Sequence, residues 1–162
     1  MNRTKGVKAL AMTVLILGII GFAIGVVFVV QGISTNSTVA EKLRAEKITL
    51  GIPEDLAAKG ELVDTAKEAQ VAADTLAEHL KSIAPTYGDL LAGERFDPTN
   101  PLQLSYAQGI NLENAFQIAT MAFGVSLIAI VSGAFMIVMG IALILVGLNS
   151  QLQLSRASLA RS

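Results

Sequence analysis

Two long runs of uncharged, mostly apolar residues dominate the chain, one over residues 9–30 and the other over residues 119–148. A helix rises about 1.5 Å per residue and a bilayer has a hydrocarbon core of about 30 Å, so about 20 apolar residues cross it. Both runs reach that length. Because a helix satisfies its own backbone hydrogen bonds in lipid, the sequence predicts an all-α membrane protein with two transmembrane helices in a hairpin.

The first run also resembles the start of a signal peptide, since basic residues precede it. The apolar part of a signal peptide is usually about 7–15 residues long, which is shorter than this run. No clear pair of small residues at cleavage-site spacing follows it. We therefore interpret residues 9–30 as an uncleaved membrane anchor.

The charged residues are divided unequally between the segments outside the two runs. All thirteen acidic residues lie between Glu41 and Glu113, whereas the ends of the chain carry only basic ones. Positive charges close to membrane helices stay on the cytoplasmic side. We expect a multi-pass protein of the plasma (inner) membrane with residues 1–8 and 149–162 in the cytoplasm and residues 31–118 outside. The tail 149–162 either continues as a helix along anionic headgroups or is a solvated segment.

Residues 61–83 have the spacing of an amphipathic helix within this mainly helical acidic region. Its apolar stripe is narrow and rich in alanine, so it buries modest area. We interpret it as an interaction helix that contacts a partner, rather than as the centre of a core. The expected contact residues are Leu62, Ala69, Leu76, Leu80 and Ile83. Asn100 followed by Pro101 is typical of a helix start, and that helix would lead into the second run.

Small residues recur every seven positions along both apolar runs. Helices in lipid associate through close backbone approach, which small residues permit. We predict a helix-packing surface, formed either between the two runs or with a larger partner; the alternative is that glycine is simply common in membrane helices. The expected packing residues are Gly18, Gly21, Gly25, Gly32, Ser126, Gly133, Gly140 and Gly147. Gly21 joins this set through the short Gly21-x-x-x-Gly25 motif.

Residues with reactive side chains are scarce. Cysteine is absent, and His79 is the single histidine, within the predicted amphipathic helix. We therefore expect no enzyme activity and assign no catalytic, cofactor-binding or metal-binding residue. The hydroxyls inside the two runs are expected to bond to their own helix backbone. Residues 31–118 hold seven basic and thirteen acidic residues, which argues against nucleic-acid binding and suits a basic protein partner.

Several short segments carry a resemblance to a known family. They are Ala45-Glu46-Lys47-Ile48-Thr49 with Pro53, Thr86-Tyr87-Gly88-Asp89-Leu90, Asn100-Pro101-Leu102, Tyr106-Ala107 and Ala122-Phe123-Gly124-Val125. Over roughly positions 1 to 150 the chain resembles two-span actinobacterial envelope proteins often labelled aromatic ring-opening dioxygenases. One histidine cannot supply the iron site that such an enzyme needs. The resemblance thus implies a topology and no catalytic residues.

Proteins of this type are similar to accessory subunits found with the cytochrome bcc-aa3 respiratory supercomplex. The resemblance implies a non-catalytic membrane subunit that supports assembly or stability of that oxidase without carrying electrons. The chain has no pattern of haem, copper or iron–sulfur ligands of its own. The alternative is a self-associating envelope protein that uses the glycine positions to pair and binds a transporter or a cell-wall enzyme.

The charge asymmetry makes a prediction about orientation. A label that cannot cross the membrane is expected to reach neither tail in intact cells, and to reach both after the cells are opened. Labelling of either tail in intact cells would contradict the predicted topology.

Overall fold

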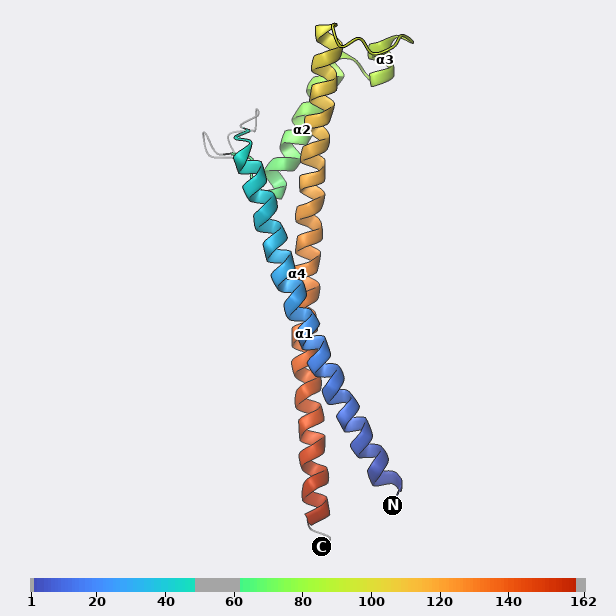
Figure 1. Cartoon of the computed structure of the whole chain (residues 1–162), viewed down its shortest axis with the longest axis vertical. Coiled ribbons are helices and arrows are strands. Elements are labelled where there is room, and N and C mark those ends of the chain that lie inside the picture. The colour runs from blue at the N-terminus through green and yellow to red at the C-terminus, as the bar shows by residue number, and fades with distance from the viewer. Residues whose placement is uncertain (1, 49–61, 160–162) are drawn as a thin grey trace. The chain divides into compact units, whose positions relative to one another are not determined.

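The structure is a computed structural model that describes residues 2–48 and 62–159, with side chains from residue 6 to 48 and from 62 to 157. It contains four helices in these ranges: α1 (Asn2–Ala45), α2 (Ala66–Ile83), α3 (Tyr87–Leu91) and α4 (Pro101–Leu159) (Figure 1). No strand occurs among the described residues. The predicted all-α fold with two long apolar helices is confirmed.

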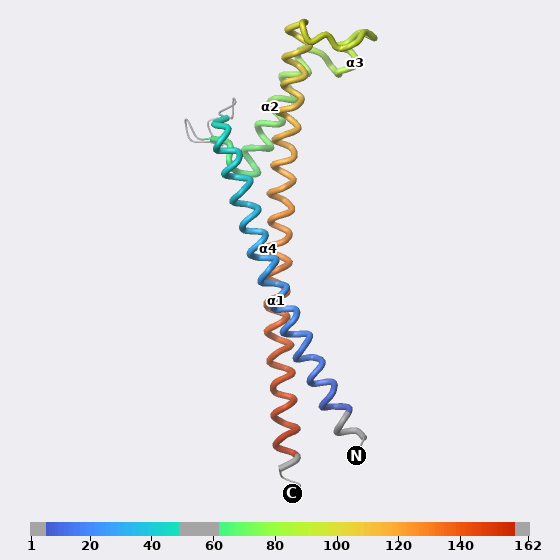
Figure 2. Tube along the Cα trace, viewed as in Figure 1, coloured from blue at the N-terminus to red at the C-terminus, as the bar shows by residue number. Residues whose placement is uncertain are grey.

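The chain divides into two compact units. The first, here the seam unit, comprises Met1–Ser34 and Ser126–Ser162; the second, here the acidic unit, comprises Thr35–Val125 and contains every acidic residue. Helices α1 and α4 are both long and apolar enough to cross a membrane, and each contributes to both units. Figure 2 shows their course along the backbone trace.

The seam unit exposes large apolar side chains along both helices. Leu10 is 65% exposed, Val27 55% and Leu145 62%. An exposed surface of this kind suits a lipid environment. Both helices extend past the apolar runs 9–30 and 119–148, because polar residues such as Asn36 and Gln151 continue the helix without a proline to stop it.

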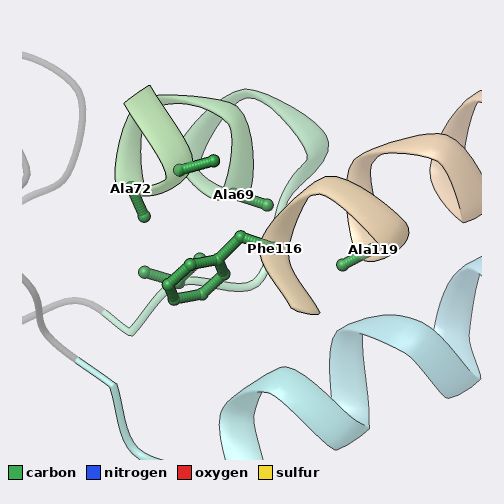
Figure 3. Packing of buried hydrophobic residues seen from close by; sticks show 6 residues of the cluster. Ala69, Ala72, Phe116 and Ala119 are labelled. Carbon is green, nitrogen blue, oxygen red and sulfur yellow. The ribbon is translucent and has the colours of Figure 1, made fainter. Parts of the chain in front are cut away.

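The acidic unit has two small apolar clusters, in which α2 packs against α4. The first holds Val63, Ala69, Ala72, Ala73, Phe116 and Ala119, with Val39 and Leu43 of α1 at its border. The second holds Leu80, Ala84 and Tyr106. Figure 3 shows Ala69 and Ala72 of α2 beside the Phe116 ring of α4, which is only 1% exposed. Phe116 is therefore the largest side chain that is fully enclosed in this unit.

Helix α2 begins at Ala66, later than the start at Glu61 that the apolar spacing suggested; Glu61 itself lies outside the described residues. The reason is a capping box. The Thr65 hydroxyl accepts a hydrogen bond from the Glu68 amide, and the Glu68 carboxylate accepts one from the Thr65 amide. This arrangement fixes Thr65 as the residue before the helix. Leu62 therefore precedes the helix, and the Val63 amide donates to the Ile48 carbonyl.

Side-chain caps also organise the connection from α2 to α4. Thr86 caps α3, and Ala92, the residue after its last residue Leu91, lies in the left-handed region. The Asp97 carboxylate accepts bonds from the Thr99 hydroxyl and amide, which lowers the pKa of Asp97. The Asn100 side chain accepts from the Leu102 and Gln103 amides, and α4 starts at Pro101, as the sequence predicts.

The Phe116 contact generates a prediction about the acidic unit. Replacing Phe116 with Ala is expected to lower the stability of α2 packing by about 3–5 kcal/mol, because it leaves a cavity among alanines that cannot fill it. Amide hydrogen exchange of α2 in detergent micelles measures this loss.

Phe96→Ala is the matched control, because Phe96 is 38% exposed and belongs to neither cluster. Its effect on exchange in α2 is expected to be within about 0.5 kcal/mol. Equal effects of the two substitutions would show that the Phe116 cluster does not hold α2.

Candidate functional site

The predicted packing residues of α1 and α4 meet each other inside the seam unit. A Cβ placed on Gly25 would lie 2.7 Å from the Gly133 carbonyl oxygen, and one on Gly133 would lie 2.6 Å from the Gly25 oxygen. Gly18 and Gly140 are paired in the same reciprocal way, at 2.9 and 2.8 Å. Real Cβ atoms do not approach this closely, so the two backbones touch only because these positions have no side chain.

The same register continues at both ends of the seam. A Cβ on Gly32 would lie 2.8 Å from the Ser126 oxygen, and one on Gly147 would lie 2.9 Å from the Leu15 Cβ. Ser126 is 1% exposed, so the largest residue of the set is also enclosed. Each step of seven residues forward on α1 matches a step of seven back on α4, which makes the pair antiparallel. This surface, Gly18, Gly25, Gly32, Ser126, Gly133, Gly140 and Gly147, is called the glycine seam below.

Gly21 does not belong to the glycine seam. No atom lies within 4 Å of a Cβ placed there, although Gly21-x-x-x-Gly25 suggested a contact. A step of seven residues turns a helix by about −20°, whereas the four-residue step from Gly21 to Gly25 turns it by about 40°. Residues that are seven apart therefore stay close to one line along the helix, and Gly21 lies to the side of that line.

The apolar face of α2 packs within the chain, whereas the sequence predicts that it contacts a partner. Ala69 is 0% exposed and Leu80 4%. Leu76 packs on the Phe116 cluster and Ile83 on the Tyr106 cluster, while Leu62 is half-buried before the helix. Alanines allow α2 to approach α4 closely, so this narrow apolar stripe is buried by the contact between the two helices. The exposed face of α2 is polar.

Three further contacts do not follow from the residue spacing. A Cβ on Gly109 would lie 2.6 Å from the Leu80 Cδ2, so α2 and α4 also approach closely there. The Tyr106 hydroxyl donates to the Ala84 carbonyl at 3.4 Å. Arg44 forms an ion pair with Asp64, and both side chains are partly exposed. Exposed pairs contribute little to stability, so this one adds little to the packing of the acidic unit.

The polar side chains of the described residues serve structural roles. The Thr13 and Thr120 hydroxyls bond back to the Ala9 and Phe116 carbonyls at 3.0 Å, as expected for hydroxyls in apolar helices. His79 is exposed on α2. Within residues 2–48 and 62–159 no three His, Asp or Glu side chains gather as metal ligands.

The geometry defines an all-α protein whose two membrane-length helices are joined by a backbone-to-backbone seam. No family model, curated protein or solved structure matches the chain.

The glycine seam generates a prediction about the hairpin. Gly133→Leu and Gly140→Leu are each expected to destabilise the α1–α4 pair by about 1–3 kcal/mol, because the added side chain overlaps the opposite backbone. The shift in the thermal unfolding midpoint in detergent micelles measures the effect.

Gly21→Leu and Gly124→Leu are the matched controls, since both positions open onto free space among the described residues. They are expected to change stability by less than about 0.5 kcal/mol. If all four variants unfold alike, the seam is not what holds the helices together.

Proposed function

We propose that the chain is a non-catalytic structural subunit of a larger membrane complex. The observation that carries this proposal is the closed glycine seam. Because α1 and α4 touch backbone to backbone at Gly25 and Gly133, the pair leaves no space between the helices at these contacts for a substrate or an ion. A solid helical pair of this kind anchors a protein and presents its outer faces to neighbours.

The proposed orientation places the acidic unit outside the plasma (inner) membrane and both termini in the cytoplasm. The basic residues of the two ends support it. The acidic unit then presents a surface with an excess of negative charge, which favours a partner with a basic face. Exposed α2 residues, including Asp74 and Glu78, contribute to that surface.

The complex that we propose is the cytochrome bcc-aa3 respiratory assembly of actinobacteria, to which the sequence resemblance points. In this assignment the chain supports assembly or stability, and the haem-bearing subunits carry the electrons. The apolar outer faces of α1 supply docking area in the membrane, with Leu17 and Val30 at 55% and 59% exposure. In the complex, the residues of α1 that contact a partner would be protected by it, whereas those that face lipid would not.

The alternative is an envelope protein that self-associates through its glycines and binds a transporter or a cell-wall enzyme. The seam geometry weighs against the first half of this alternative. Gly18, Gly25 and Gly133 are covered by the opposite helix of the same chain, so pairing between chains through them requires the hairpin to open.

Affinity purification of the tagged full chain from native membranes in a mild detergent tests the proposal. We expect haem-containing subunits in stoichiometric amounts, visible by absorbance and mass spectrometry. The double variant G133L/G140L is expected to recover less of them than G21L/G124L, because an opened hairpin presents its faces in the wrong geometry. Purification without haem proteins, and with a transporter or cell-wall enzyme instead, would favour the alternative.

A further inference from the structure

One side of α4 in the acidic unit carries a second seven-residue pattern, separate from the glycine seam. Its members alternate at spacings of three and four residues, as the a and d positions of a coiled coil do. Six of them are exposed and Ala107 is half-buried. They are Leu104, Ala107, Asn111, Asn114, Ile118, Met121 and Val125, called the open face below.

We propose that the open face binds the open face of a second copy of this chain, with the two α4 helices parallel. Ile118, Met121 and Val125 are 66%, 70% and 65% exposed, so other described residues leave most of these side chains uncovered. Leu104, Asn111, Ile118 and Val125 take the a positions, and Ala107, Asn114 and Met121 take the d positions. Two of the four a positions, Ile118 and Val125, hold β-branched residues, which are common at a in two-stranded parallel coiled coils.

Lipid alone does not account for the apolar part of the open face. Residues 118–148 would measure about 46 Å as a helix, so fitting them into about 30 Å of hydrocarbon needs a tilt of about 50°, beyond the usual range of about 0–40°. In the acidic unit, residues 34–38 of α1 are polar and exposed. Val39, which follows them, packs against the cluster that contains Phe116. The apolar side chains of α4 in this unit therefore need a protein cover.

Two asparagines point to a copy of the same chain as that cover. The Asn111 and Asn114 side chains are exposed and make no hydrogen bond to any described residue. In a parallel pair equal positions meet, so each Asn111 faces the Asn111 of the other copy. An amide carries both donors and an acceptor and is therefore complementary to itself. An asparagine at an a position also fixes the register of such a pair.

The charges of α4 permit this pairing. Glu113 is the single charged residue between Pro101 and Ser155, and it lies off the open face, where it accepts a hydrogen bond from Gln117. Two copies therefore bring no like charges together along the helix. Ala115 and Ala122, which flank the open face, are small enough to allow close approach.

One hollow lies beside the open face at Asn111. It has a volume of about 390 Å³ and is lined by Tyr87, Ala107, Ile110 and Asn111.

The open face runs over three heptad repeats, from Leu104 to Val125, all within the acidic unit.

Cysteine cross-linking tests this inference, since the full chain has no cysteine of its own. Single cysteines are placed one at a time from Leu104 to Val125 and oxidised in native membranes. We expect disulfide dimers to peak at Asn111, Asn114, Ile118 and Val125, at least about fivefold above Lys67→Cys and Glu78→Cys on the exposed face of α2, because a disulfide needs Cα atoms within about 7 Å.

A charge variant gives a second readout. Asn111→Asp places two carboxylates against each other in the proposed dimer, so it is expected to reduce the Val125→Cys cross-link at least about fivefold at neutral pH. Gln70→Glu adds the same charge on the outer face of α2 and is expected to leave that cross-link unchanged.

A cross-linking profile without the seven-residue period, or equal yields at the α2 controls, would overturn the inference. So would cross-links from the open face to a different protein, which would assign this face to an unlike partner. The result does not depend on haem subunits, so it is separate from the test of the proposed function.

Discussion

Direct contact between two backbones is the constraint on which the arrangement of α1 and α4 depends. At Gly25 and Gly133 even one methyl group would overlap the opposite carbonyl oxygen. In a membrane, helices gain nothing by hiding apolar surface from water, so van der Waals contact at short range has to hold them. Contacts between Cα hydrogens and carbonyl oxygens recur at close helix–helix interfaces and add weakly to their stability. Bulk at one pair would therefore separate its neighbours as well.

The acidic unit, outside the seam, also relies on small residues for close packing. Helix α2 contributes Ala69, Ala72 and Ala73 to its core, and Gly109 of α4 admits Leu80. Small side chains bury little apolar area each, but they bring the helices so close that one phenylalanine fills the remaining space. Because attraction between packed atoms falls off steeply with distance, close packing compensates for the shortage of large apolar residues. This explains how a segment with few aromatics encloses a core among its described residues.

The sequence predicts the two long helices, their apolar character and the seven-residue seam, because composition and period are local properties. The register is not local, since shifting α1 by seven residues would again place small residues opposite small ones. Gly21 shows the limit of a short motif: its spacing to Gly25 is right, but its direction on the helix is not. The start of α2 was readable in principle from Thr65 and Glu68, yet the apolar period extends back to Leu62 and suggested an earlier start. Whether the face of α2 binds a neighbour or its own chain depends on where α4 passes, which no spacing within α2 reveals.

Helix α4 carries two seven-residue patterns, and their geometry is compatible. An ideal helix drifts by about 20° in each seven residues, so a seam of this period stays in contact only if the helices supercoil gently to the left. The glycine seam and the open face have the same period but use different heptad positions: Gly133 and Gly140 occupy b of the heptad in which Ile118 and Val125 occupy a. The residues that close the seam are therefore not residues of the open face.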